Sequence, residues 1–220
     1  MQWLESRWIG ERLAEIPDAS LFPLLDLGSS TLEFRTAVQP YIDEGIFAPL
    51  RARGGQVWHV DAKAGSGIDH AGDLLDPGFV ARLQGLRARS ALVLSILQHV
   101  ADRAALARSV LRLVPPGGYI FVSGPRRFPV HRDPIDNLFR PSIEEVHALF
   151  PDTELVASTI LDAGNWRQWR AEERGGRSLS RYVARLCMPF YRPRKWLEVA
   201  VEAPYLIRHI ETYAVVLRRR

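Results

Sequence analysis

Short apolar runs alternate along the chain with stretches of helical spacing. Residues 2–16 place Trp3, Trp8 and Leu13 on one side of an expected helix. Residues 21–30 follow as a short apolar run that ends in a carboxylate and a glycine, which is typical of a buried strand leaving the core. The same reasoning predicts further strands at residues 56–63, 67–71, 90–100, 117–125, 153–161 and 212–219.

Helix-start signals stand between these runs. Asp76 precedes Pro77, and Asp102 precedes an amphipathic stretch, so both aspartates are expected N-caps. Two pairs also have the spacing of a capping box, in which each side chain bonds a backbone N–H of the other residue. These pairs are Ser30 with Glu33, and Ser142 with Glu145.

The predicted strands are continuous apolar runs that alternate with helices, and this pattern is typical of a parallel sheet covered on both faces. We therefore predict an α/β, doubly wound fold with a mostly parallel seven-stranded sheet. Residues 1–220 are expected to form a single domain, and residues 164–206 form a basic, aromatic-rich helical insertion before the last strand.

Composition narrows the classes of protein without naming one. The 220 residues are 47% hydrophobic, which suffices for one domain with a real core. The single cysteine, Cys187, excludes an internal disulfide framework and a cysteine-rich metal site. We see neither a signal-like leader nor an apolar run of the ~20 residues that a membrane span needs. A cytoplasmic protein is expected, with peripheral membrane contact left open.

Charge divides unevenly along the chain. Residues 1–163 hold 16 Lys and Arg against 20 Asp and Glu, whereas residues 164–220 hold 13 against 5. In residues 166–204 the basic side chains alternate with tryptophan, tyrosine and phenylalanine. A lid over a pocket, a homodimer contact, and a membrane-surface segment would all use such residues, and the last would bind anionic lipid. Nucleic acid is disfavoured because no recognition motif is present and residues 1–163 are acidic.

Polar residues follow the predicted strands at their carboxyl ends, where ligands sit in doubly wound sheets. A glycine turn at Gly28 and Ser29 follows Asp26, and Asp61, Asp73 and Ser95 follow later strands. Positions 30 and 33 are not glycines, so the turn lacks the dinucleotide pattern G-x-G-x-x-G. Asp61 is placed to accept hydrogen bonds from ribose hydroxyls and Asp73 from an adenine amino group. The pattern therefore suits an adenosine without a diphosphate.

Five segments carry a resemblance to the class I S-adenosylmethionine-dependent methyltransferases, most closely to their small-molecule (methyltransferase type 11-like) branch. In chain order they read LLDLGSS, HVDAK, GDLLD, ALVLSILQHV and LVPPGGYIFVSGP. The resemblance covers roughly residues 20–163 and the final strand. It implies a Rossmann-like fold and S-adenosyl-L-methionine as cofactor. By resemblance, Asp26 and Gly28 with the adjoining turn hold the methionine part, Asp61 the ribose and Asp73 the adenine.

Two departures from the family's pattern stand out. The usual second glycine of the turn is Ser30. Asp61 lies 33 residues beyond Gly28, longer than the ~20 of a simple strand–helix–strand unit. An extra turn or helix within residues 41–50 would account for the added length.

The loop after the fifth predicted strand, residues 128–142, concentrates groups able to do chemistry. His131 is our first candidate for a general base toward a hydroxyl acceptor, with Asp133 as its orienting partner. His99 is the second candidate base. Asp136 and Arg140 are candidate substrate ligands, and the spacing matches no known metal-ligand signature. The plain alternative is a solvated, proline-rich turn.

The function predicted from these residues is methyl transfer from S-adenosylmethionine to a small-molecule acceptor, such as a hydroxyl of a sugar or a lipid-linked compound. Two alternatives remain open. One is a catalytically silent methyltransferase-like binding subunit, which the Ser30 departure would suit. The other is a nucleotide-sugar or NAD-binding Rossmann enzyme, against which the missing glycines count.

Overall fold

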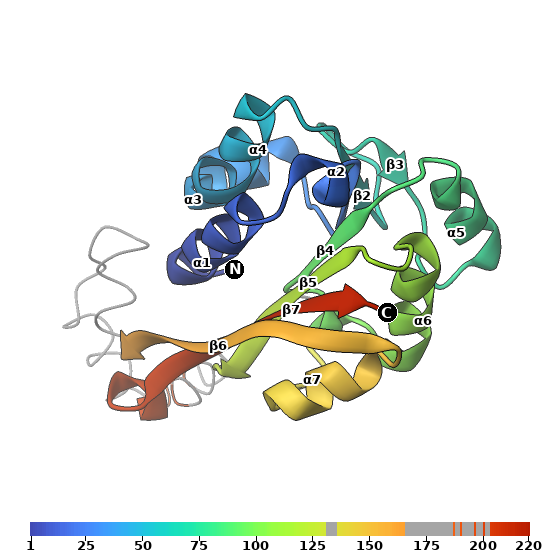
Figure 1. Cartoon of the computed structure of the whole chain (residues 1–220). Helices are drawn as coiled ribbons and strands as arrows, with labels where there is room; N and C mark the ends of the chain where they lie inside the picture. Colours follow the sequence, from blue (N-terminus) through green and yellow to red (C-terminus); the bar gives the residue numbers. More distant parts are fainter. Residues whose placement is uncertain (131–135, 166–186, 188–189, 191–195, 197–199, 201–202) are drawn as a thin grey trace.

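The computed structural model describes residues 1–130, 136–165 and 203–220, together with the single residues Cys187, Phe190, Trp196 and Ala200. Its elements alternate in the predicted way, and Figure 1 shows them around one sheet. The strands are β1 (Leu24–Leu27), β2 (Val57–Asp61), β3 (His70–Ala71), β4 (Ser90–Leu94), β5 (Tyr119–Arg127), β6 (Thr153–Asn165) and β7 (His209–Arg219).

The seven strands form one sheet in the order β3-β2-β1-β4-β5-β7-β6. Neighbours from β3 to β5 run parallel, while β7 is antiparallel to both β5 and β6. The predicted doubly wound, mostly parallel α/β fold is therefore confirmed. The antiparallel pair comes last because β6 and β7 are successive strands of a hairpin, with residues 166–208 between them.

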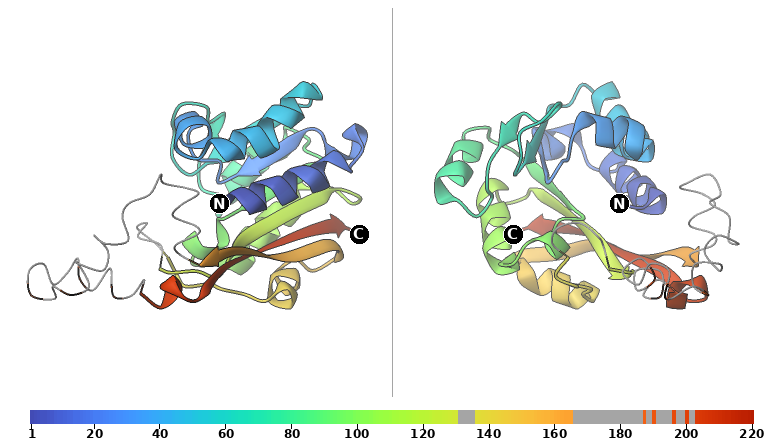
Figure 2. Two further views of the ribbon diagram at one scale, coloured as in Figure 1. Left: turned by 90° about the vertical axis from the view of Figure 1, so that its left-hand side faces the viewer. Right: turned by 180° about the vertical axis from the view of Figure 1, so that it is seen from behind.

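Helices cover both faces of the sheet (Figures 1 and 2). One face packs against α5 (Pro77–Gln84), α6 (Arg103–Leu113) and α7 (Ile143–Leu149). The other packs against α1 (Trp3–Ala14), α2 (Asp18–Leu21) and the helices that follow β1. The inner strands β1 and β4 have no exposed residue, which explains why they read as continuous apolar runs.

Three of the four predicted helix starts are confirmed. Asp76 and Asp102 accept backbone N–H groups at the starts of α5 and α6, and Ser142 with its glutamate partner forms both bonds of a capping box at α7. The start predicted at Ser30 is wrong. Ser30 has a φ of 55°, and the hydroxyl of Thr31 instead accepts the N–H of Phe34 at 3.2 Å.

The extra length between β1 and β2 is helical, as expected. It folds into the π-helical turn η1 (Phe34–Val38), α3 (Pro40–Ile42), the π-helical turn η2 (Asp43–Phe47) and α4 (Ala48–Ala52). These helices pack on α1 and bury Ile46, Phe47 and Leu50 against the face of the sheet that α1 covers. Two short 3-10 turns complete the described elements, η3 (Leu97–His99) and η4 (Ala203–Leu206).

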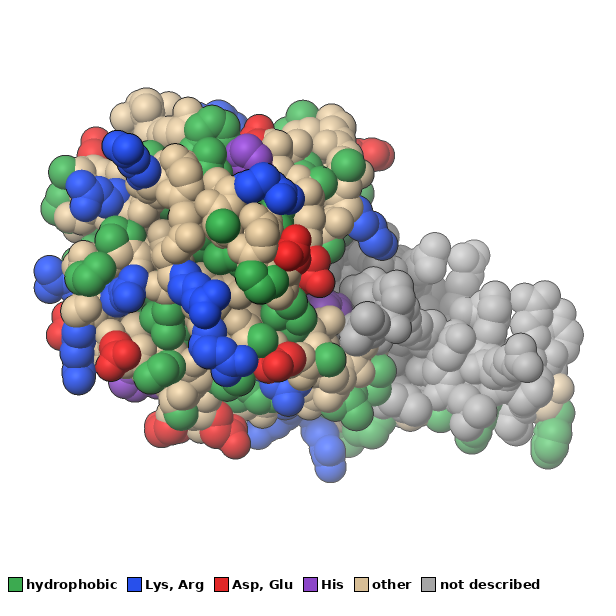
Figure 3. Space-filling model, turned by 90° about the vertical axis from the view of Figure 1, so that its right-hand side faces the viewer, with side chains coloured by type: hydrophobic (Ala, Val, Ile, Leu, Met, Phe, Trp, Pro, Cys, Tyr) green, Lys and Arg blue, Asp and Glu red, His purple; other side chains and the backbone are tan. Residues whose placement is uncertain are grey.

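Most of the basic, aromatic-rich insertion lies outside the described residues. On the face at the right-hand side of Figure 1, basic and acidic side chains are interspersed (Figure 3). No helix within the described residues is long and apolar enough to cross a membrane.

Candidate functional site

The strand order reverses between β1 and β4, and the site predicted from the sequence lies at the carboxyl ends of these two strands. Three residues there have the positive φ angles that side-chain-bearing residues rarely adopt: Gly28 at 80°, Ser30 at 55° and Ser95 at 53°. Ser30 and Ser95 carry a Cβ and are strained in this conformation, and such strain gathers at functional sites, where surrounding contacts hold it in place. The turns after β1 and β4 are therefore the strongest candidates for a functional site at this edge of the sheet.

The glycine turn after β1 packs closely on the turn after β4. A Cβ added to Gly28 would lie 2.9 Å from Cδ1 of Ile96. The backbone N–H groups of Gly28 and Ser29 both donate to the carbonyl of Val60, at 2.8 and 3.0 Å. Ser29 is buried, and its hydroxyl donates to the carbonyl of Ser30 at 3.1 Å. The turn is thus fixed between β2 on one side and the β4 turn on the other.

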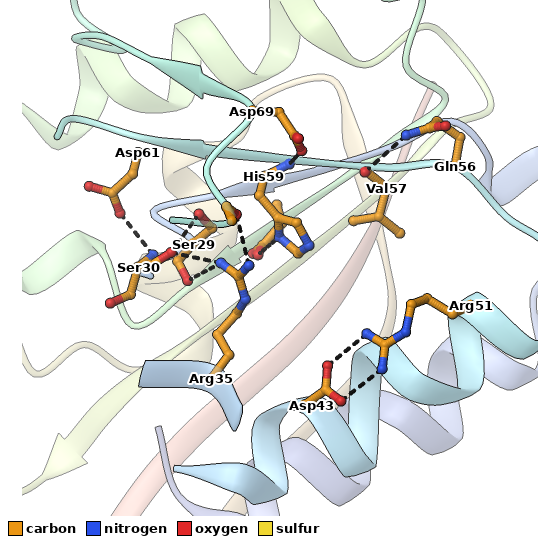
Figure 4. Close-up of polar contacts among 12 residues, drawn as sticks. Ser29, Ser30, Arg35, Asp43, Arg51, Gln56, Val57, His59, Asp61 and Asp69 are labelled. Carbon is orange, nitrogen blue, oxygen red and sulfur yellow. Dashed lines mark hydrogen bonds and ion pairs between the residues drawn. The ribbon is translucent and has the colours of Figure 1, made fainter. Parts of the chain in front are cut away.

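Asp61 ends β2 and faces this turn (Figure 4). Its Oδ2 accepts the backbone N–H of Ser30 at 2.9 Å, and its Oδ1 accepts the N–H of Lys63 at 3.2 Å. Each carboxylate oxygen can accept a second hydrogen bond, and the residue is partly exposed. Asp61 therefore holds the turn and keeps acceptor capacity for the two hydroxyls of a ribose.

Arg35 holds the same turn from the other side, and sequence reasoning missed it. Its side chain comes from η1 and donates to the carbonyls of Ser29, Ser30 and Gly67, at 2.7 to 3.0 Å (Figure 4). Desolvation by burial lowers the pKa of Arg35, against the opposing charge of Asp26. A single arginine in a short helical turn gives no signal of this role in the sequence.

Asp26 lies inside β1 and pairs with the neighbouring strand. Its Oδ2 lies 2.9 Å from Nδ1 of His59, which faces it in the parallel register of β1 and β2. The Asp26 residue is only 4% exposed. The edge of the His59 ring packs on Phe47, with ring centres 4.9 Å apart. Contact of Asp26 with the methionine part of a cofactor stays a prediction, and its observed partner is a histidine.

Asp73 lies at the edge of the site, after β3. It is exposed, and its Oδ1 accepts the N–H of Leu75 at 2.8 Å in a local turn. This leaves the second carboxylate oxygen, Oδ2, open toward solvent among the described contacts. An adenine contact from this position remains a prediction.

Ser95 joins the β4 turn to the N-terminal helix. Its backbone N–H donates to the carbonyl of Ser123 on β5, at 2.9 Å. Its hydroxyl lies 3.4 Å from a carboxylate oxygen of Glu5, and the hydroxyl of Ser123 donates to that same oxygen. Glu5 is 1% exposed and was not among the predicted site residues. The backbone N–H of Gln2 donates to Glu5, and their three-residue spacing at the start of a helix is a sequence signal that could have drawn attention to Glu5.

The structure describes three of the five predicted catalytic and substrate-binding residues. His131 and Asp133 lie outside the described residues. His99 lies in η3, with Nε2 at 3.2 Å from the side-chain nitrogen of Gln98. The remaining two, Asp136 and Arg140, are described and paired with each other.

The Asp136–Arg140 pair is bidentate and largely buried. The two guanidinium Nη atoms lie 3.1 and 2.8 Å from the carboxylate oxygens. The Asp136 side chain is 1% exposed and that of Arg140 is 15% exposed. Nearby, the side chain of Asn137 donates to the carbonyls of Leu97 and Val100, which docks this loop on η3. Substrate contact by Asp136 or Arg140 stays a prediction.

Comparison with known proteins gives a likeness of structure only. No protein-family model matches the chain, and neither does any curated protein. A solved SAM-dependent methyltransferase from Anabaena variabilis is 12% identical, with 97% of this chain and 84% of that chain covered and a TM-score of 0.55. Coclaurine N-methyltransferase bound to S-adenosylhomocysteine is 12% identical, with 97% and 70% covered and a TM-score of 0.54.

A third likeness is to phosphoethanolamine N-methyltransferase 2 from Haemonchus contortus. It is 12% identical, and the match covers 99% of this chain and 52% of that one, with a TM-score of 0.52. The three neighbours share a class of enzyme, and the strand order with its switch-point turn agrees with the predicted resemblance. The chain therefore has the fold of the class I S-adenosylmethionine-dependent methyltransferases.

Proposed function

We propose that the protein transfers the methyl group of S-adenosylmethionine to a small-molecule acceptor. The observation that carries the proposal is the strained, fixed turn at the switch point with Asp61 beside it. The fold gives the same expectation, since the neighbouring structures are methyltransferases.

The described residues fit the cofactor. The turn at Gly28 and Ser29 would lie along its methionine part, Asp61 would accept from the ribose hydroxyls, and Asp73 would accept from the adenine amino group. When bound, S-adenosylmethionine supplies an electrophilic methyl on a sulfonium. Because the Asp61 carboxylate and the Arg35 guanidinium already hold the turn, binding requires little rearrangement of the backbone.

The chain's own part in the reaction is chiefly positioning, because transfer requires the nucleophile in line with the methyl carbon. With the cofactor held, a lone pair of the acceptor would form the new bond to the methyl carbon, and the electrons of the broken bond would stay with sulfur in S-adenosylhomocysteine. A hydroxyl acceptor must also lose its proton, and His99 is the described candidate to receive it. His131 and Asp133 stay predicted for this role, as does a sugar or lipid-linked hydroxyl as the acceptor.

Titration calorimetry with S-adenosylhomocysteine tests the proposal. We expect micromolar binding of S-adenosylhomocysteine and none of NAD, because the turn lacks the glycines that approach a pyrophosphate. Binding of NAD without S-adenosylhomocysteine would favour the nucleotide-binding Rossmann alternative.

A silent binding subunit is the second candidate, and Ser30 keeps it open because a side chain stands where the family has a glycine. It would bind S-adenosylhomocysteine yet transfer no methyl from S-adenosylmethionine to any member of an acceptor panel. The single changes His131→Ala and Asp133→Ala separate the enzyme from the silent subunit further. If the enzyme uses the loop of residues 128–142, these variants should lose turnover while they still bind the cofactor.

The insertion's partners remain predictions as well. Flotation of the full chain with anionic liposomes, against a chain lacking residues 166–204, tests peripheral membrane contact. Sedimentation of the same two chains tests a homodimer.

A further inference from the structure

A polar cluster lies beneath the start of α1, on the side of the switch point away from β2. We call Gln2, Glu5, Ser123 and Thr212 the Glu5 cluster: the first three are joined by hydrogen bonds, and Thr212 lies on the same face of the sheet as Ser123. Glu5 accepts the backbone N–H of Gln2 at 3.1 Å and the hydroxyl of Ser123 on β5. All four residues are at least 96% buried, with exposed fractions of 4%, 1%, 0% and 3% in the order given. None of these groups was assigned a role in methyl transfer above.

Glu5 is a buried acid whose contacts are uncharged. Its partners are two hydroxyls and one backbone N–H, and among the described residues it forms no ion pair. Burying a carboxylate is costly unless a cation or several donors compensate it. Three neutral donors supply part of this compensation, and a positive group beside Glu5 would add to it.

Two further oxygens of the cluster have no hydrogen-bond partner. These are Oγ1 of Thr212 and Oε1 of Gln2, which faces the backbone N–H of Glu5 in the capping-box arrangement at the start of α1. Thr212 pairs with Pro125 in the antiparallel β5–β7 register, and Ala214, two residues later, pairs with Ser123. Since strand side chains alternate between faces, Thr212 and Ser123 point to the face that α1 covers. Buried polar atoms are almost always satisfied, so such orphaned oxygens mark the place of a missing donor.

The cluster adjoins the proposed cofactor turn. Ser95 connects the two, because its strained backbone bonds β5 while its hydroxyl lies 3.4 Å from Glu5. A group held by Glu5 would thus lie beside the end of β4, at the edge where doubly wound sheets bind their ligands.

We infer that the Glu5 cluster binds the amino group of the methyl acceptor, which makes the acceptor an amine in place of the hydroxyl compound predicted from the sequence. An ammonium offers three donors and a positive charge, matching two orphaned oxygens and one carboxylate. A hydroxyl offers a single donor and no charge. This inference rests on the proposed function. The α-amino group of the cofactor has the same chemistry, and the experiment separates these two sources.

The test uses the full-length protein and two matched probes, phenethylamine and 2-phenylethanol. Each is titrated by calorimetry with and without saturating S-adenosylhomocysteine. The variants are Glu5→Gln, which keeps shape and an acceptor oxygen, and Thr212→Val, which removes only the orphaned hydroxyl. The control is Tyr213→Phe, which removes another partnerless buried hydroxyl from the adjacent residue on the opposite sheet face.

The control lies close to the cluster. Burial, and then the charge of Glu5, raises the pKa of Tyr213. Its hydroxyl packs on Gly124, on the face away from α1. A general disturbance of β7 would therefore affect Thr212→Val and Tyr213→Phe alike, whereas a bound amine distinguishes them.

We expect the wild-type protein to bind phenethylamine and not 2-phenylethanol. Glu5→Gln should weaken amine binding about tenfold or more, because a charge-assisted hydrogen bond is lost. Thr212→Val should weaken it by about threefold, with an unchanged melting temperature, and Tyr213→Phe should leave it unchanged. Affinity for S-adenosylhomocysteine should stay the same in all three variants.

Four results would overturn the inference. They are a protein that binds no amine, equal binding of the alcohol, equal effects of Thr212→Val and Tyr213→Phe, and loss of S-adenosylhomocysteine affinity in Glu5→Gln. The last would assign the cluster to the cofactor's own amino group. Amine binding that depends on Glu5 in a protein that binds no S-adenosylhomocysteine would uphold the cluster and reject the proposed function.

Discussion

Buried polar groups are satisfied in opposite ways on the two sides of the switch point. On the β2 side the groups bond one another: Asp26 pairs with His59, and Arg35 and Asp61 hold the glycine turn between them. On the β5 side, Glu5 has uncharged partners and two neighbouring oxygens have none. The glycine turn on the first side is held by charged partners in the absence of a ligand, whereas the buried acid on the second side has only neutral partners.

This difference matches the demands of the two ligands. A cofactor that is used in every turnover binds more tightly to a site that is rigid beforehand, because the protein loses less conformational entropy on binding. An acceptor must be recognised by groups that are left unpaired without it, and that arrangement rejects analogues lacking the matching group. The β2 side should therefore respond to mutation in stability and cofactor affinity, and the β5 side in acceptor affinity.

The largest effect is expected for Arg35→Met. Three backbone carbonyls, of which that of Ser29 is buried, would lose their donor, and the free energy of unfolding should fall by about 3 kcal/mol. Arg51→Met is the matched control in the same region (Figure 4), because Arg51 forms a bidentate pair with Asp43 but is 58% exposed, and it should cost under about 1 kcal/mol. Urea denaturation measures both. Equal losses would contradict the view that the turn depends on a buried clamp.

Asp61→Ala should weaken S-adenosylhomocysteine binding about 30-fold, or roughly 2 kcal/mol, since the ribose would lose a charged acceptor. Calorimetry gives the affinity, and Asp73→Ala is the exposed comparison, expected to lose less than threefold. If Asp61→Ala retained wild-type affinity, the ribose assignment would be wrong.

Gly28→Ala separates backbone strain from contact. Gly28 and Gly117 have nearly the same φ, 80° and 81°, but only a Cβ at position 28 would press on a neighbour, Ile96. Both alanine variants should be destabilised by about 1 kcal/mol, from the left-handed conformation alone. Only Gly28→Ala should also lower S-adenosylhomocysteine affinity. Thermal melting would measure the loss of stability in both variants, and calorimetry would show whether only Gly28→Ala also loses cofactor affinity.

The smallest effect is a pH dependence. The hydrogen bond from Arg51 lowers the pKa of Asp43 below its ordinary value of 3.8. A lowered folded-state pKa gives stability that is present above the unfolded-state value and is lost as pH falls through the folded one. Because Arg51 is exposed, the contribution should be under about 1 kcal/mol. Unfolding at pH 7 and pH 2.5 should show Arg51→Met losing less stability on acidification than the wild type.

Much of the fold could be predicted because its signals are local. Apolar runs such as residues 90–94 are buried on both faces, and the aspartate N-caps need only their own helix. Ser30 shows where local reading fails. Ser30 and Glu33 do have the spacing of a capping box. However, Asp61, which is distant in the sequence, accepts the N–H of Ser30, and Ser30 has a positive φ that does not suit an N-cap.

The candidate site could be predicted only at the strand ends. Asp61 and Gly28 follow apolar runs, so their place at the sheet edge is a direct consequence of parallel topology. Arg35 and Glu5 come from helices that reach the edge through tertiary packing. The packing of η1 and α1 against the sheet decides which of their residues point into the site. Hydrophobic periodicity alone does not predict those residues.

The position of β7 has a consequence for how the chain is made. β7 lies between β5 and β6, so β6 has no partner strand until the ribosome has synthesised β7. Until then β6, with its exposed Leu155 and Val156, and the outer edge of β5 both present unpaired backbone that can recruit other nascent chains. Expression slowed before β7 emerges should therefore favour aggregation of this protein.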